Sequence, residues 1–183
     1  MNELHKSFLT KTVWVTIVVF SIRCLISWAE LSSKVSLYSL FGFAGEAIGI
    51  TFALMLLYER KLWRYNPLES TPKLSKKYTG TLVSSYDNIK REATLEIKQT
   101  LFTIRITLTT NESKSKSLSA TIEEILGEKQ LVYCYLNTPE ARFRDRSEIH
   151  FGTAKLCVDK PEKIMGQYYT DRKTVGDLYF VAE

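Results

Sequence analysis

The segment at residues 138–148 (TPEARFRDRSE) holds the densest cluster of groups that could bind a phosphate. Three arginines alternate around one aromatic residue: Arg142, Phe143, Arg144 and Arg146. A guanidinium is a planar, bidentate partner for phosphate oxygens. The same segment also holds three carboxylates: Glu140, Asp145 and Glu148. Because these carboxylates can neutralise the arginines, composition favours a solvated hairpin tip, with phosphate binding as the competing interpretation.

Groups that would support catalysis or hold a metal are few. The cysteines and histidines are isolated in the sequence: Cys24, Cys134, Cys157, His5 and His150. They form no CxxC pair or His/Asp/Glu cluster, which excludes a recognisable metal or disulfide framework and suits a reducing compartment. No nucleophile motif, paired carboxylates or glycine-rich phosphate loop is present. We therefore predict a non-enzyme without catalytic residues, metal or cofactor.

Two apolar segments, residues 12–28 and 37–58, are long enough to cross a membrane. A helix rises 1.5 Å per residue, so each can span a hydrocarbon core of about 30 Å. A cleaved signal peptide is the rival interpretation of the first, but its cleavage pattern is weak and a second apolar segment follows closely. Residues 1–77 hold ten basic and five acidic side chains. Basic residues flank the segments outside their short connection, which predicts an inner-membrane hairpin with both termini cytoplasmic.

Each apolar segment contains one ionisable residue, Arg23 in the first and Glu46 in the second. With 3.6 residues per turn, Glu46 shares a helix face with Gly42, Gly45 and Gly49. Small residues let helices approach, and charges in lipid seek partners, so we expect these faces to pack against protein. An Arg23–Glu46 pair within one chain and a pair between chains both remain open, and two helices enclose no pore.

From residue 78 onward the sequence alternates between apolar and polar residues. In residues 101–109, for example, Ile104, Ile106 and Leu108 point one way while Arg105 and Thr107 point the other. The pattern predicts eight short strands, at residues 78–85, 93–99, 101–109, 118–125, 130–137, 149–158, 163–170 and 176–182.

Short turn-like links between these strands indicate an antiparallel up-and-down sheet. We predict a compact eight-stranded barrel over residues 74–183, large enough inside for side chains or one small ligand. A sandwich is the structural alternative. Residues 1–73 then form the hairpin and the juxtamembrane linker, and the polar, linker-like composition covers residues 68–77. Residues 78–183 carry fifteen basic and fifteen acidic side chains, which argues against a DNA- or RNA-binding protein.

The order of several short motifs resembles a known family along the whole chain. The motifs are WRYNP (63–67), Gly80, SSY (84–86), IKQT (97–100), LVYCYLNTP (131–139), HFGTAKL (150–156) and GQYYTDRKTVG (166–176). In this order they resemble the SMODS-associated two-transmembrane, beta-strand-rich effectors of bacterial cyclic-oligonucleotide-based anti-phage signalling (CBASS). One departure is Tyr78, where the family pattern has Trp before the glycine of the first strand.

The resemblance implies a cytoplasmic barrel that binds a cyclic dinucleotide made by a partner nucleotidyltransferase during infection. Binding would drive self-association, and the clustered hairpins would disrupt the inner membrane and stop growth. The alternative from a different class is a membrane-tethered barrel that carries or senses a lipid or other apolar ligand. Polar, tyrosine-rich inward faces would favour the nucleotide, and a continuous aliphatic lining would favour the lipid.

A cyclic dinucleotide offers two phosphates and two flat bases, so its site should combine a guanidinium with aromatic faces and polar donors. The last hairpin supplies such a set, in which we place Arg172 on phosphate and one tyrosine on a base: Tyr168, Tyr169, Thr170, Arg172 and Thr174. Two neighbouring strands add residues on shared faces: Tyr133, Tyr135, Asn137, His150 and Gly152. Four more would line the rim if their turns lie at the open end: Ser84, Ser85, Gln99 and Thr100. Ordinary hydrogen bonding of a strand histidine is the competing interpretation of His150.

Overall fold

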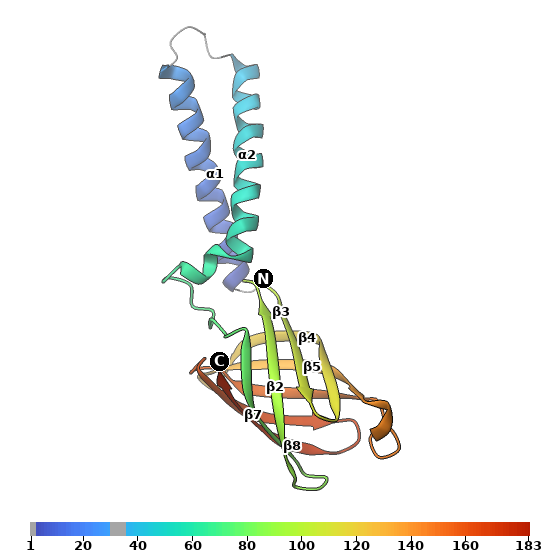
Figure 1. Ribbon diagram of the computed structural model, residues 1–183. Helices are drawn as coiled ribbons and strands as arrows, with labels where there is room; N and C mark the ends of the chain where they lie inside the picture. Colours follow the sequence, from blue (N-terminus) through green and yellow to red (C-terminus); the bar gives the residue numbers. More distant parts are fainter. Residues whose placement is uncertain (1–2, 30–35) are drawn as a thin grey trace. The chain divides into compact units, whose positions relative to one another are not determined.

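The computed structural model describes residues 3–29 and 36–183 and divides into two units, one up to Tyr65 and one from Asn66. In the first unit, α1 (Glu3–Ala29) and α2 (Leu37–Arg60) run side by side, followed by a short helix η1 (Leu62–Tyr65) (Figure 1). Both long helices have the length and hydropathy of membrane spans. The start of α2 is capped by Ser36, whose hydroxyl accepts a hydrogen bond from the backbone N–H of Ser39 at 3.2 Å. Most of the connection between the helices, residues 30–35, lies outside the described residues.

The second unit is a closed barrel of eight antiparallel strands (Figure 1). The strands are β1 (Lys77–Ser84), β2 (Lys90–Gln99), β3 (Ile104–Thr110), β4 (Ser113–Ile125), β5 (Glu128–Pro139), β6 (His150–Cys157), β7 (Lys163–Thr170) and β8 (Val175–Ala182). Each strand pairs with the next, and β1 pairs with β8 to close the barrel. This confirms the predicted fold over the sandwich alternative.

Apolar side chains that alternate along the strands fill much of the barrel interior. Leu95, Ile97, Leu156, Ile164 and Phe180 are all buried in one continuous core. On β3, Ile106 and Leu108 point inward as their alternation indicates, while Arg105 is exposed. Burial of these residues stabilises the fold by the hydrophobic effect, at about 25 cal/mol per Å² of apolar surface.

The polar segment before β1, interpreted from sequence as part of a linker, is bonded to the barrel. Leu74 is fully buried in the barrel core. The Gln99 side chain accepts from the Leu74 backbone N–H at 3.0 Å and donates to the Pro72 carbonyl at 2.8 Å. The Lys129 ammonium donates to the Ser70 carbonyl at 2.6 Å. Residues 70–74 therefore belong structurally to the barrel unit.

Strand β4 begins five residues earlier than the sequence pattern indicates. Its register shifts between Ser117 and Ser119, where a β-bulge lies. Before the bulge Ser113 and Ser115 face the cavity described below, and after it Ala120 and Ile122 pack against the core. The bulge thus switches the inward set from odd to even residue numbers. Because the first inward residues are serines, alternation of hydrophobicity could not reveal this part of the strand.

Candidate functional site

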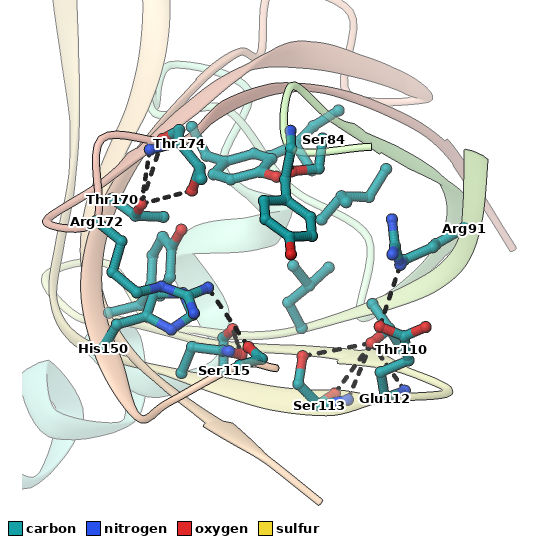
Figure 2. A pocket seen from close by; sticks show the side chains of 18 of the residues that line it. Ser84, Arg91, Thr110, Glu112, Ser113, Ser115, His150, Thr170, Arg172 and Thr174 are labelled. Atoms are coloured by element: carbon teal, nitrogen blue, oxygen red, sulfur yellow. Dashed lines mark hydrogen bonds and ion pairs between the residues drawn. The ribbon is translucent and has the colours of Figure 1, made fainter. Parts of the chain in front are cut away.

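One end of the barrel opens into a cavity of about 290 Å³ (Figure 2). The mouth lies at the turns β1–β2, β3–β4, β5–β6 and β7–β8, and the β5–β6 connection carries a short helix η2 (Ala141–Phe143). The lining residues are Leu82, Ser84, Tyr86, Asp87, Arg91, Leu108, Thr110, Glu112, Ser113, Ser115, Tyr133, Tyr135, Asn137, Arg146, Ser147, His150, Tyr168, Thr170, Arg172, Thr174 and Leu178.

Three buried tyrosines, Tyr133, Tyr135 and Tyr168, form the aromatic part of the lining. The rings of Tyr133 and Tyr135 are tilted at 47°, with centroids 5.8 Å apart. Two glycines on neighbouring strands make room for the rings of Tyr135 and Tyr168. A side-chain carbon at Gly152 would overlap the Tyr135 ring, and one at Gly176 would overlap the Tyr168 ring. These strand glycines therefore position the aromatic wall.

The hydroxyl of Tyr133 is buried and has no hydrogen-bond partner among the described residues. Such a group costs about 1–3 kcal/mol of stability, so natural folds rarely keep one without a purpose. Burial raises the pKa values of Tyr133, Tyr135 and Tyr168, with the Ser84 hydroxyl opposing the shift at Tyr168. All three therefore stay protonated near neutral pH.

The cavity also presents three guanidiniums, which differ in how they are paired. Arg91 binds Asp87 through both Nη atoms and lies 3.2 Å from Glu112 through Nε. Arg146 lies 2.8 Å from Glu112. Arg172 makes a single long hydrogen bond, to the Ser147 hydroxyl at 3.4 Å, and within the described residues it has no carboxylate partner (Figure 2). Arg172 is thus the guanidinium of the lining most available to an anion.

The hydrogen bonds between Arg91 and Asp87 are strong enough to perturb titration. They hold the pKa of Asp87 at about 2, and the backbone N–H of Ile89 adds to the shift. The same pairing raises the pKa of Arg91. Both groups therefore stay charged at neutral pH, which fixes the β1–β2 turn against the start of β2.

Asn137 and His150 lie directly opposite each other on β5 and β6 and are both buried. The Ser115 hydroxyl donates to Asn137 Oδ1 at 2.8 Å. His150 Nδ1 lies 2.8 Å from the Glu148 carbonyl, so this nitrogen carries the proton and Nε2 is left as an acceptor. Burial lowers the pKa of His150, which keeps the ring neutral near pH 7. The pair therefore offers neutral polar groups suited to a base edge.

Most of the candidate ligand residues from the last hairpin and from β5 and β6 come together in this cavity. The lining contains Tyr168, Thr170, Arg172 and Thr174, together with Tyr133, Tyr135, Asn137, His150 and Ser84. The Thr170 and Thr174 hydroxyls lie 2.6 Å apart and close the β7–β8 turn. Gly152 contributes by the space it leaves for Tyr135. That these residues bind ligand stays a prediction.

Besides Gly152, four of the candidate residues lie outside the cavity lining. Tyr169 points outward and is 47% exposed, so of the two adjacent tyrosines only Tyr168 faces the cavity. Ser85 accepts a hydrogen bond from the Val175 backbone at 3.0 Å beside the mouth. Gln99 and Thr100 lie on the β2–β3 turn, at the opposite end of the barrel from the cavity turns, so their placement on the rim was wrong. The predicted up-and-down order already places consecutive turns at opposite ends, so this turn could not share an end with Ser84 and Ser85.

Sequence reasoning missed several lining residues: Leu82, Tyr86, Asp87, Arg91, Leu108, Thr110, Glu112, Ser113, Ser115, Ser147 and Leu178. Some carried a usable signal, since Leu82 shares a strand face with Ser84, and Leu108 belongs to the predicted inward set of its strand. Arg146 was considered in the arginine-rich segment, and it alone of the three arginines there lines the cavity.

In the helical unit, Arg23 and Glu46 form an ion pair within one chain, with 2.7 Å between Nε and Oε2. Arg23 also lies over the Phe43 ring, 4.5 Å from its centroid. The three glycines of α2 do not face α1. A side-chain carbon added at Gly42, Gly45 or Gly49 would meet no atom within 4 Å in the described residues. This glycine face is therefore left open by the hairpin itself.

No group of three or more metal-ligating side chains occurs in residues 3–29 and 36–183. The site is a polar, aromatic cavity with arginines at its mouth. These lining groups suit recognition of an anionic molecule that carries rings. The non-catalytic role expected from the sequence stays a prediction.

Comparison with known proteins matches residues 69–181 to the family model "Cap15, cyclic dinucleotide receptor domain". The matched region covers the barrel almost completely. A protein of Staphylococcus schleiferi described as CD-NTase-associated protein 15 is 30% identical over 189 residues, which cover 97% of this chain and 97% of that protein. The family match over the barrel and the relative's match over nearly the whole chain agree with the two-helix and barrel architecture. The chain therefore belongs to the Cap15 family of CBASS effectors, which carry a cyclic dinucleotide receptor domain.

Proposed function

We propose that the barrel binds a cyclic dinucleotide in the cavity at its open end, with Arg172 on a phosphate and the buried tyrosines beside a base. The observation that carries this proposal is the polar, tyrosine-rich lining, in which Arg172 has no carboxylate partner among the described residues. A phosphodiester supplies the missing anion through charge-assisted hydrogen bonds. The messenger comes from a partner nucleotidyltransferase that acts during infection.

The size of the cavity supports partial enclosure of the ligand. A volume of about 290 Å³ is at the lower end of ligand pockets, which measure about 300–1,000 Å³. A cyclic dinucleotide contains two nucleosides and two phosphates, so one base enters the barrel and the other half extends past the mouth. Tyr86, which lines the mouth and is 73% exposed, supplies an aromatic face for that outer half.

The lining also bears on the lipid-carrier alternative. A lipid would favour a continuous aliphatic wall, whereas only three of the lining side chains are aliphatic: Leu82, Leu108 and Leu178. Arginines, carboxylates, hydroxyls and amides occupy most other positions. This composition favours a nucleotide over a lipid.

We further propose that ligand binding drives self-association, and that the associated hairpins disrupt the inner membrane and arrest growth. The open glycine face of α2 (Gly42, Gly45 and Gly49) supports this step, because small residues let a second helix approach closely. Basic residues at the end of α2 and after it, including Arg60, Lys61 and Arg64, support cytoplasmic termini. The barrel then meets its messenger in the cytoplasm.

A titration of the detergent-solubilised full chain tests ligand binding. Cyclic di-GMP, cyclic di-AMP, cyclic GMP–AMP and a long-chain fatty acid are each added to the wild type, Arg172→Ala and Arg105→Ala. We expect at least one cyclic dinucleotide to bind, and Arg172→Ala to lose about 1.5–3 kcal/mol, or roughly tenfold to a hundredfold in affinity. Arg105 is exposed on the outer face of β3, so Arg105→Ala should match the wild type. Binding of the fatty acid alone would support the carrier instead.

A further inference from the structure

One carboxylate at the mouth of the cavity is shared between two arginines from different parts of the barrel. Glu112, in the β3–β4 turn, places Oε2 3.2 Å from Arg91 Nε and Oε1 2.8 Å from Arg146 Nη2. Each oxygen of the carboxylate thus serves one guanidinium. Figure 2 shows Glu112 and Arg91 side by side at the mouth.

The two arginines are held with very different strength. The Arg91 side chain is 18% exposed, and Asp87 binds it through two further hydrogen bonds. The Arg146 side chain is 51% exposed, and Glu112 is its single carboxylate partner among the described residues. Exposed ion pairs of this kind are weak. Arg146 can therefore leave Glu112 at low cost, while Arg91 stays in place.

The arrangement around Glu112 has the chemistry of a bound phosphodiester. Two oxygens that share one negative charge and lie between two guanidiniums are what a phosphodiester also provides. A cyclic dinucleotide carries two such groups, and Arg172 can take one of them. Ser147, which contacts Arg172, is the neighbour of Arg146 in the β5–β6 connection, so the two arginines approach the mouth from the same side.

We propose that Glu112 occupies the place of the second phosphate in the unliganded receptor and releases Arg146 to that phosphate when the ligand enters. The inference rests on the proposed cyclic dinucleotide binding. It makes Arg146 a ligand-binding residue and Glu112 an internal competitor that lowers the affinity for the messenger.

The Glu112 side chain is not needed to join the turns that it bridges. The backbone N–H of Glu140 donates to the Glu112 carbonyl at 2.9 Å and already connects the β3–β4 turn with the β5–β6 connection. The Glu112 backbone N–H is satisfied by the Thr110 hydroxyl at 3.2 Å. Replacement of the carboxylate by an amide therefore leaves the local backbone contacts in place.

The test compares the affinities of full-length variants for the tightest-binding cyclic dinucleotide of the panel above. We expect Glu112→Gln to bind about fivefold more tightly and Arg146→Ala about tenfold more weakly than the wild type. In the double variant, the gain from Glu112→Gln should disappear. A matched pair in the same connection serves as control, because Arg142 and Glu140 form a 2.9 Å ion pair but do not line the cavity. Arg142→Ala and Glu140→Gln should bind as the wild type does.

Unchanged or weaker binding by a folded Glu112→Gln protein overturns the exchange while cyclic dinucleotide binding stands. Arg146 lies in an exposed connection, so Arg146→Ala remains informative even if Glu112→Gln does not fold. Wild-type affinity in Arg146→Ala also overturns the exchange. If the wild type binds no cyclic dinucleotide, the proposed function fails and the exchange fails with it. Thermal melts of each variant establish folding.

Discussion

Tyr133 combines a well-packed ring with a hydroxyl that destabilises the fold. Its ring packs in the barrel core, whereas its hydroxyl is buried without a partner among the described residues. A buried hydroxyl that lacks a hydrogen bond destabilises the fold, and removing it is often neutral or stabilising. Tyr133 also lines the cavity, so we propose that the wall rearranges when a ligand enters and that the hydroxyl then gains a partner.

Tyr133→Phe should therefore stabilise the unliganded protein and weaken ligand binding. We expect the free energy of unfolding to rise by about 1 kcal/mol and the affinity for the cyclic dinucleotide to fall several-fold. Thermal melts and calorimetric titration of the same sample measure the two quantities. Tyr179→Phe is the matched control, because Tyr179 is half exposed on β8 and lies outside the lining. A Tyr133→Phe protein that is less stable than the wild type would show that the hydroxyl has a structural partner.

Asp87 gives a prediction for acid stability. The pKa of Asp87 is about 2 in the folded protein, whereas its ordinary value, which applies to the unfolded chain, is 3.8. Folding therefore favours the charged carboxylate. This contribution is complete above pH 4 and is lost as the pH falls from about 4 to 2. The wild type should thus lose more stability than Asp87→Asn across that interval, as measured by denaturant unfolding at each pH. Parallel losses in the two proteins would mean that Asp87 is not held by Arg91 in solution.

At the scale of elements, alternation of hydrophobicity was sufficient to locate eight strands but not their polar ends. Residues 101–109 were recognised because Ile106 and Leu108 face the core. The first half of β4, SKSKS, was missed because its inward side chains are serines that line the cavity. In this part of β4, the residues that line the cavity are the ones that depart from the pattern used to find strands.

The candidate site was predicted where it depends on one hairpin and missed where it depends on strand pairing. Tyr168, Thr170, Arg172 and Thr174 lie close in the sequence and meet in the cavity. Arg91 and Glu112 lie opposite each other just beyond the last β2–β3 pair, and pairing of β4 with β5 brings the segment of Arg146 beside Glu112. The misplacement of Gln99 was avoidable, since consecutive turns of the predicted up-and-down sheet lie at opposite ends.

The contacts of residues 70–74 with the barrel predict where an independent domain begins. A fragment of residues 66–183 should fold cooperatively without the helices, because its core and its backbone hydrogen bonds are complete. A fragment of residues 78–183 lacks Leu74 and leaves the Gln99 side chain without Pro72 and Leu74 as partners. We expect it to be less stable by about 2–5 kcal/mol, as for other losses of a buried leucine. Circular dichroism melts compare the stabilities of the two fragments. Equal stability would mean that residues 70–74 are only a linker.

At the scale of the whole molecule, the proposed function assigns sensing and membrane damage to different units. The cavity lies within the barrel, whereas the open glycine face and the Arg23–Glu46 pair lie within the helices. Substitutions in one unit should then leave the function of the other unchanged. Glu46→Leu is the less clean test, because it leaves Arg23 without its carboxylate inside an apolar helix.

Gly45→Leu separates the two functions more cleanly. A side-chain carbon added at Gly45 meets no atom of the described residues within 4 Å apart from its own helical turn, so we expect the hairpin to be undisturbed while approach of a second helix is blocked. We expect unchanged affinity for the cyclic dinucleotide and loss of dye entry into cells that express an active partner nucleotidyltransferase. Ile50→Leu, on another exposed face of α2, is the control at equal expression. Dye entry as in the wild type would mean that the glycine face takes no part in the damage.

Closure of the barrel also constrains how this receptor can evolve. Pairing of β1 with β8 leaves no free edge among the described strands, so another chain cannot join by adding a strand to the sheet. Association must then rely on side chains and loops, whose contributions change by small steps with single substitutions. If the messenger triggers assembly as we propose, the concentration at which it does so can therefore be adjusted gradually over generations, without risk to the backbone pairing that maintains the fold.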